Sequence, residues 1–282
     1  MYTFTSFEDP LAYNGLTTPR GISGNTIVGG YSDSKLIGHG FIYNGSGFTT
    51  LDDPLGYATV ATGISGNTIV GAYFTNPDDV EPSGFIYNGS SFTTLDDPLG
   101  VNGTEPNAIY GNTIVGVYFD SNSVSHGFVY NGSTFTTLDN PGTSSDFASG
   151  IYGNTIVGYS VSPQESWTYT SSTFTTLTGL PSGFYPNGIY GSTIVGDIGG
   201  SSQSGFVYNG STYSVVNPPG AVFGNGLGVD IYGVYNGTLI GQYYNGDGYE
   251  GFIATPVPEP AELSFMCAAG LLLMRRRTAR GA

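Results

Sequence analysis

Basic residues are scarce in this sequence. Lysine and arginine together number six among 282 residues, against 21 acids, and only 10% of the residues are charged. Four of the arginines lie in the last eight positions, so residues 1–256 contain two basic residues against 19 acids, a balance of −17. A body of this charge repels phosphate backbones, which argues against nucleic acid as a partner and favours cations or neutral surfaces.

Cysteine and helix-forming charged residues are also scarce. The single cysteine, Cys267, lies near the C-terminus, which excludes a disulfide within residues 1–256. The shortage of lysine and glutamate argues against long helices, whereas 22 tyrosines and 17 phenylalanines suit half-buried strands. The 46 glycines supply turns at regular intervals. The composition therefore predicts an all-β protein.

Three short motifs repeat along residues 1–256. The first motif reads GISGNTIVG at 21–29 and occurs six times in all, with its isoleucine at 22, 64, 109, 151, 189 and 231. The steps between copies are 42, 45, 42, 38 and 42 residues. The second motif, HGFIYNG at 39–45, also occurs six times, but the third, FTTLDDP at 48–54, follows its partners only five times. The missing sixth copy stands at the other end of the body, as FTSFEDP at 4–10.

Each repeat reads as four short strands. In the second repeat we expect them at Thr59–Ser65, Thr68–Tyr73, Gly84–Tyr87 and Phe92–Leu95. Gly-Asn separates the first two strands and Asn-Gly the last two, and both dipeptides are signals for two-residue hairpin turns. Four strands every 40–45 residues is the period of a propeller blade.

We therefore predict that residues 1–256 form a six-bladed β-propeller closed by the N-terminal strand. The strand at Tyr2–Glu8 should pair with Gly251–Ala254 and lock the ring. A seven-bladed ring lacking one blade and an open β-solenoid are the alternatives. The displaced strand disfavours both, because only a closed ring gains from placing one strand at the opposite end of the chain.

The same topology predicts that charge is segregated. Antiparallel strands alternate in direction, so the tight hairpins lie on one face of the disc, and the long loops and inter-blade connections lie on the other. The acids fall in or beside the second class of loop: Glu8, Asp9, Asp33, Asp52, Asp53, Asp78, Asp79, Glu81, Asp96, Asp97, Asp120, Asp139, Asp197, Asp247 and Glu250. One face should be strongly acidic and the other nearly neutral.

Paired carboxylates in the inter-blade turns are candidate metal ligands. Asp52, Asp53, Asp96 and Asp97 could hold Ca²⁺, which takes 6–8 oxygen ligands. Aspartate before proline is first of all a turn signal, however, and no calcium-loop spacing occurs. The same repetition argues against acid–base catalysis by these pairs. His39 and His126 occupy equivalent strand-start positions two blades apart, and we interpret them as solvent-facing rather than metal-binding.

The motifs resemble the HAF family of extracellular repeats. In that family a Gly-Ile segment and an Ile/Val-Val-Gly strand precede a His-Ala-Phe strand, which HGF at 39–41 and 126–128 matches with glycine for alanine. The histidine is replaced in the other repeats by Ser83, Glu165, Ser204 and Glu250. The resemblance implies an exported repeat protein and carries no catalytic assignment.

Residues 257–282 depart from the repeat pattern. Pro258, Glu259 and Pro260 precede an apolar segment, Leu263–Met274, and then Arg275, Arg276 and Arg277. Twelve helical residues span about 18 Å, less than the roughly 30 Å hydrocarbon core, so we expect only transient membrane contact, through a short hydrophobic sorting helix. This order resembles the PEP-CTERM sorting signal of Gram-negative bacteria. The resemblance implies recognition and removal of the tail by an exosortase, and we expect an N-terminal export signal upstream of MYTFTSFEDP.

These patterns favour an exported, non-enzymatic protein of the cell surface or exopolysaccharide matrix, in which the propeller is a rigid interaction scaffold. No catalytic residue or cofactor is assigned. A calcium-dependent glycan-binding propeller and a carbohydrate-active hydrolase or lyase working at the axial funnel remain alternatives.

Overall fold

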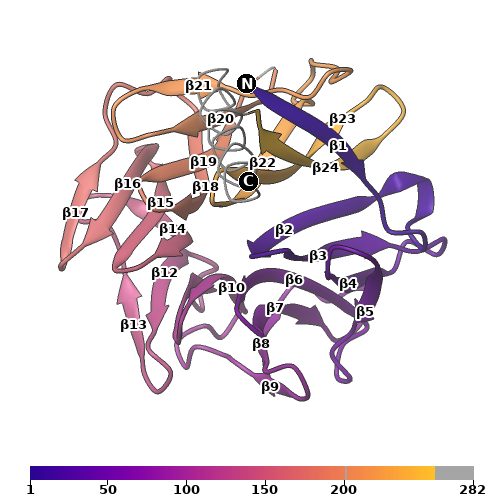
Figure 1. Ribbon diagram of the computed structural model, residues 1–282. Helices are drawn as coiled ribbons and strands as arrows, with labels where there is room; N and C mark the ends of the chain where they lie inside the picture. Colours follow the sequence, from indigo (N-terminus) through magenta and orange to yellow (C-terminus); the bar gives the residue numbers. More distant parts are fainter. Residues whose placement is uncertain (201, 258–282) are drawn as a thin grey trace, which may run out of the picture.

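The protein is a ring of six four-stranded antiparallel sheets around a central axis (Figure 1), seen in a computed structural model that describes residues 1–200 and 202–257. Blade 1 contains β2 (Thr17–Ser23), β3 (Thr26–Ser32), β4 (Gly38–Tyr43) and β5 (Phe48–Leu51). Blade 2 contains β6 (Ala58–Ser65), β7 (Thr68–Phe74), β8 (Ser83–Tyr87) and β9 (Phe92–Thr94). Blade 3 contains β10 (Thr104–Tyr110), β11 (Thr113–Phe119), β12 (Ser125–Tyr130) and β13 (Phe135–Leu138).

The second half of the ring repeats this order. Blade 4 contains β14 (Ser144–Tyr152), β15 (Thr155–Ser162), β16 (Glu165–Thr170) and β17 (Thr173–Thr176). Blade 5 contains β18 (Phe184–Tyr190), β19 (Thr193–Ile198), β20 (Ser204–Tyr208) and β21 (Tyr213–Val215). Blade 6 contains β22 (Val229–Tyr235), β23 (Thr238–Tyr244) and β24 (Tyr249–Pro256), completed by β1 (Tyr2–Phe7). A 3₁₀ turn, η1, occupies Tyr13–Gly15.

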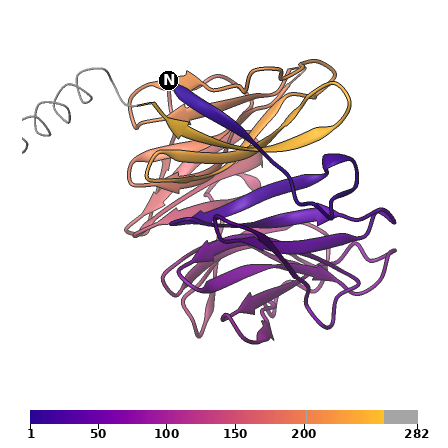
Figure 2. The same ribbon diagram turned by 45° about the vertical axis from the view of Figure 1, so that its right-hand side comes forward.

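The predicted closure is confirmed. β1 pairs antiparallel with β24 from Tyr2 opposite Pro256 to Phe7 opposite Gly251, and Figure 2 shows the two strands side by side. Phe7 is 4% exposed, and its ring lies 5.8 Å from that of Phe41 and 4.9 Å from that of Phe48, both in blade 1. The first strand therefore fastens the last blade and also packs into the core of the next one.

The glycine that ends the first motif is required by the packing of each blade. A Cβ atom at Gly71 would lie 2.1 Å from the carbonyl oxygen of Val60 on β6 and 2.7 Å from the ring of Phe85 on β8. The equivalent glycines face the same crowding in all six blades. The aromatic side chains that fill this space are fully buried: Phe41, Phe85, Phe128, Trp167, Phe206 and Phe252. The motif is therefore repeated because all six blades have the same packing requirement at this glycine.

The two hairpins of blades 1, 2, 3 and 5 differ in length, which corrects one expectation. Gly24 and Asn25 form a two-residue loop between Ser23 and Thr26, with φ of +61° at Gly24. The Asn-Gly pair instead opens a four-residue loop, residues 88–91 in blade 2. The side-chain oxygen of Asn88 accepts hydrogen bonds from the backbone N–H groups of Ser90 and Ser91, both at 2.9 Å. This capping by the asparagine side chain stabilises a longer turn than the dipeptide signals.

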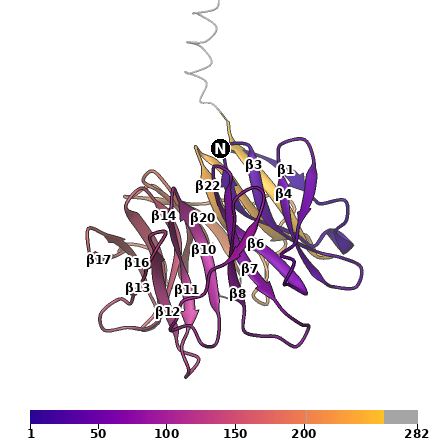
Figure 3. The ribbon, with the colours of Figure 1, turned by 90° about the horizontal axis from the view of Figure 1, so that it is seen from below.

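The predicted segregation of charge is present in the described residues. The hairpins on one side of the disc carry no charged side chain, at 24–25, 44–47, 66–67, 88–91, 111–112, 131–134, 153–154, 171–172, 191–192, 209–212 and 236–237. We call this side the neutral face. The long loops and inter-blade connections, with the acids named above apart from Asp197, form the opposite acidic face; Figure 3 views the strands that run between the two.

The expected sorting helix, residues 263–274, lies outside the described residues. Within residues 1–200 and 202–257, no helix has the length and apolarity needed to cross a bilayer.

Candidate functional site

A β-bulge occurs at the same position in the innermost strand of every blade. In β2 the pairing with β3 passes from Pro19 directly to Gly21, which leaves Arg20 as an extra residue outside the ladder. The other five innermost strands shift at the equivalent point, and the bulged residues are Thr62, Asn107, Ser149, Asn187 and Tyr232. Bulges redirect side chains, and here all six residues line the channel on the axis.

Most of the bulged side chains bind the neighbouring blade. Thr62 Oγ1 donates to the Pro106 carbonyl oxygen at 2.5 Å, and Asn107 Nδ2 donates to the Ala148 carbonyl oxygen at 3.0 Å. Ser149 and Asn187 donate in the same way to the next blade, to the carbonyl oxygens of Pro186 (2.5 Å) and Ile231 (3.1 Å). At the closing interface the Arg20 guanidinium lies 5.1 Å from the centroid of the Tyr232 ring.

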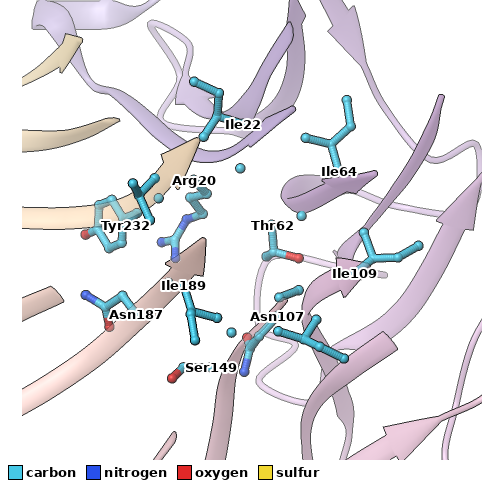
Figure 4. Close-up of a pocket in the computed structure, with 18 residues that line it drawn as sticks. Arg20, Ile22, Thr62, Ile64, Asn107, Ile109, Ser149, Asn187, Ile189 and Tyr232 are labelled. Carbon is cyan, nitrogen blue, oxygen red and sulfur yellow. The ribbon is translucent and has the colours of Figure 1, made fainter. Parts of the chain in front are cut away.

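The channel contains a cavity of about 240 Å³ beside this ring. Arg20, Glu105 and Tyr159 line it, together with Thr62, Asn107, Val117, Phe147, Ser149, Asn187 and Tyr232. Toward the neutral face the channel narrows to a space of about 80 Å³. Figure 4 shows that narrower part, where the bulged side chains and the five isoleucines and one valine two residues further along the strands surround the axis.

Arg20 and Glu105 are charged side chains of the cavity that make no hydrogen bond or salt bridge within residues 1–200 and 202–257. Burial raises the pKa of the Glu105 carboxyl, and the positive charge of Arg20 partly offsets that rise. The guanidinium has five N–H donors and the ionised carboxylate only acceptors. The cavity therefore offers unused donors from blade 1 and unused acceptors from blade 3.

The remaining carboxyls of the channel are held by amide side chains. Asp197 on β19 accepts from Asn187 Nδ2 at 2.7 Å and from Gln203 Nε2 at 3.2 Å. The same Gln203 nitrogen donates to Asp230 on β22 at 2.5 Å, and Gln242 Nε2 donates to that carboxyl at 3.0 Å. Burial, reinforced by the charge of Asp230, raises the pKa of Asp197 to about 6. Burial likewise raises the pKa of Asp230.

The walls of the channel are not equivalent. Phe147 and Tyr159 stack in blade 4, with centroids 4.9 Å apart, and Tyr185 meets Tyr159 edge-on at 5.0 Å. Burial raises the pKa of Tyr159 to about 12, so its hydroxyl is a neutral donor at physiological pH. Gly30 and Ala72 occupy the strand position equivalent to Tyr159 in blades 1 and 2. Aromatic side chains therefore line one side, and the other side has room for a ligand.

The predicted calcium candidates make local contacts in and beside the inter-blade turns. Asp53 and Asp97 are buried, and each accepts a backbone N–H within its own turn, from Leu55 and Leu99, at 2.9 Å. Asp52 contacts His39, and Asp96 accepts the Gly84 backbone N–H at 3.0 Å. In residues 1–200 and 202–257, no set of three or more His, Cys, Asp or Glu side chains is arranged to hold a metal ion.

The two histidines have matching surroundings on the acidic face and do not belong to the channel lining. His39 Nδ1 lies 2.8 Å from Asp52 Oδ2, and its Nε2 lies 3.7 Å from Asp33 Oδ2. The equivalent distances at His126 are 2.9 Å to Asp139 and 3.7 Å to Asp120. The sorting-motif residues Pro258, Glu259, Pro260, Arg275, Arg276 and Arg277 lie outside the described residues.

The channel residues were missed by the search for repeated motifs. Asp197 was expected in or beside a long loop, but it lies within β19, and Glu105 and Asp230 lie in the innermost strands β10 and β22. A signal was available in the differences between repeats. The residue before Gly21, Gly63, Ala108, Gly150, Gly188 and Gly233 changes in every blade except for one repeated asparagine, and these are the bulged positions. In blade 6 the structure aligns Val234, and not the expected Ile231, with the isoleucine of the first motif.

Two solved structures with TM-scores of 0.50 or more support the propeller fold at low sequence identity. Trypanosoma rangeli sialidase has a TM-score of 0.53 at 9% identity, covering 98% of this chain and 60% of that one. The β-propeller domain of the Trilobed protease from Pyrococcus furiosus has a TM-score of 0.50 at 11% identity, covering 86% and 84%. The six-bladed fungal lectin of Aleuria aurantia has a TM-score of 0.48 at 15% identity, covering 89% and 99%. No protein-family model matches the sequence, and no curated protein matches it.

Proposed function

We propose that the protein is an exported, non-enzymatic binding propeller whose axial cavity takes a sugar residue of an extracellular glycan. The observation that carries the proposal is that Arg20 from blade 1 and Glu105 from blade 3 line one cavity and make no hydrogen bond or salt bridge within the described residues. A polar group without a protein partner is costly once a ligand displaces its water, unless the ligand supplies the hydrogen bond. The ligand must therefore carry both acceptors and donors.

A sugar fits these requirements. Its hydroxyl and ring oxygens accept from the Arg20 guanidinium, and its hydroxyl groups donate to the Glu105 carboxylate. The stacked rings of Phe147 and Tyr159 supply the aromatic surface that the C–H faces of a pyranose cover. The cavity of about 240 Å³ is smaller than the roughly 300–1,000 Å³ of typical drug-sized pockets, which suits one sugar unit at a time.

A glycan array probed with the purified full chain tests this function. Arg20→Gln and Glu105→Gln should abolish the signals of the wild-type chain, and Lys35→Gln, an exposed loop change of the same charge as Arg20→Gln, should preserve them. Signals that survive both channel substitutions would place glycan binding elsewhere. Signals that vanish with a chelator and return with Ca²⁺ would favour the calcium-dependent alternative.

A glycoside hydrolase is the second candidate, and one observation favours it. Burial raises the pKa of Asp197 to about 6 and also raises that of the neighbouring Asp230, and two buried carboxyls side by side are candidates for an acid and base pair. Against it, amide nitrogens already occupy oxygens of both carboxyls. Release of reducing sugar from the host's exopolysaccharide, lost in Asp197→Asn, would establish the hydrolase and overturn the non-enzymatic proposal.

The export part of the proposal is supported by the tail sequence alone. Pro258-Glu259-Pro260, the apolar segment Leu263–Met274 and Arg275–Arg277 stand in the order of an exosortase signal. We propose delivery to the cell surface or exopolysaccharide matrix of a Gram-negative bacterium, with the tail removed. A tagged chain with residues 257–282 should reach the matrix, and the same chain without them should not.

A further inference from the structure

Four tyrosines form a continuous arc on the neutral face. The ring centroids of Tyr110 and Tyr152 lie 5.0 Å apart, those of Tyr152 and Tyr190 4.7 Å, and those of Tyr190 and Tyr235 4.8 Å. Each tyrosine is the last residue of the innermost strand in blades 3 to 6, where that strand enters its hairpin. We call this set the tyrosine arc. Blades 1 and 2 have Ser23 and Ser65 at the same position.

The tyrosine arc surrounds an apolar channel mouth on an uncharged surface. One residue before the arc position, the innermost strands contribute a ring of aliphatic side chains: Ile22, Ile64, Ile109, Ile151, Ile189 and Val234. Figure 4 shows several of them around the axis. The hairpins of this face carry no charged residue among the described residues. The face therefore combines apolar side chains, tyrosine rings and neutral amide and hydroxyl groups.

The chain leaves the fold at the same face. β24 runs toward the neutral face, and the Val257 backbone N–H donates to the Met1 carbonyl oxygen at 2.9 Å. Pro256 lies against the hairpin that follows Tyr235, since its Cγ is 3.3 Å from where a Cβ of Gly237 would stand. The apolar segment Leu263–Met274 and the three arginines thus follow from a point next to one end of the tyrosine arc.

We propose that the neutral face is the side of the propeller that lies against a membrane, with the tyrosine arc at the headgroup level and the acidic face directed away. The inference rests on the transient membrane contact that the tail sequence predicts and adds the orientation of the body. Tyrosine is favoured at membrane–water interfaces, where its ring and hydroxyl meet apolar and polar surroundings. Anionic lipids repel carboxylates, and every described carboxylate lies on the acidic face or within the channel.

Exposed leucines on the acidic face define the competing orientation. Leu11, Leu55 and Leu99 are 62%, 64% and 59% exposed. Each follows an acid–Asp-Pro sequence, Glu8-Asp9 before Leu11 and an aspartate pair before the other two, so burying these leucines in lipid would bring carboxylates to the bilayer surface. The neutral face offers its aromatic surface without that penalty.

Fluorescence quenching on vesicles tests the orientation with the full chain. Cys267→Ser removes the native thiol, and Asn112→Cys on the neutral face or Asn122→Cys on the acidic face of the same blade then carries an environment-sensitive dye. On phosphatidylcholine–phosphatidylglycerol vesicles with a headgroup quencher, the label at 112 should lose most of its emission and the label at 122 should keep it. Tyr152→Ser with Tyr190→Ser, which installs the residue of blades 1 and 2, should weaken vesicle partition by roughly tenfold.

Three outcomes would overturn the proposal: stronger quenching at 122, equal quenching at both labels, or no binding of the full chain to vesicles. Unchanged partition of the doubly substituted chain, with its fold verified by circular dichroism, would remove the tyrosine arc from the contact. Arg20→Gln should leave the quenching pattern unchanged. The glycan array therefore tests binding in the channel, the quenching experiment tests the membrane orientation, and either proposal can fail without the other.

Discussion

Replacing Arg20 by glutamine should weaken glycan binding strongly and lower the stability of the fold only slightly. Arg20 makes no hydrogen bond or salt bridge within the described residues, so the loss comprises its contact with the Tyr232 ring, 5.1 Å away, and its charge attraction to the Glu105 and Asp230 carboxyls. Such contacts contribute roughly 0.5–2 kcal/mol. At about 2–4 °C per kcal/mol for a chain of this size, the melting temperature should fall by less than about 8 °C. Circular dichroism of the Arg20→Gln chain measures this shift.

The effect of the same substitution on affinity should be larger. Hydrogen bonds to a charged group contribute about 1.5–3 kcal/mol, so the dissociation constant should rise by roughly 10- to 150-fold. Isothermal titration with the glycan identified on the array measures it, and Lys35→Gln controls for the loss of one positive charge. An Arg20→Gln chain that binds normally would refute the assignment of the cavity. If Lys35→Gln weakened glycan binding equally, the effect would come from the electrostatic field of the whole protein and not from a contact in the cavity.

Gly71→Ala should destabilise the fold by about 3 kcal/mol or more, because its Cβ would lie 2.1 Å from a backbone oxygen; Gly47→Ala, with nothing within 4 Å, should change the melting temperature little. Phe7→Ala should lower the free energy of unfolding by about 3–5 kcal/mol, and Thr5→Ala should lower it by less than about 0.5 kcal/mol. Denaturant unfolding measures both, and similar values for the two would argue that closure of the ring by β1 adds little to stability. The pKa of Asp197 is raised to about 6 from 3.8, so its ionisation should lower stability by about 2 kcal/mol as pH rises from 4 to 6. Thermal melts of Asp197→Asn should show a smaller fall in melting temperature over that interval, and an unchanged fall would contradict the assignment.

The architecture could be predicted because every blade packs in the same way and therefore needs the same residues at the same positions. Glycine in the second strand, an aromatic residue in the third and glycine in the hairpin are needed six times, so they recur in the sequence. The displaced motif at residues 4–10 predicted the pairing of β1 with β24, which is present from Tyr2 to Phe7. Strand limits in blade 2 agree with the predicted ones to within one residue.

The channel could not be found by the same reasoning, because it is formed by the positions at which the repeats differ. Arg20 and Glu105 are 85 residues apart in the sequence and belong to different parts of their strands. Only closure of the ring brings blades 1 and 3 around one cavity, and only the bulge turns Arg20 toward the axis. The length of the turn at Asn88 was also not predicted, because it depends on a local hydrogen bond in which the Asn88 side chain caps a longer loop.

A crystal structure of the full chain with the array-selected glycan is the most direct test of axial binding. A sugar ring should occupy the cavity, with oxygens within hydrogen-bond distance of both the Arg20 guanidinium and the Glu105 carboxylate. A glycan held on the loops of the acidic face or on the tyrosine arc, with the channel occupied by water alone, would contradict it.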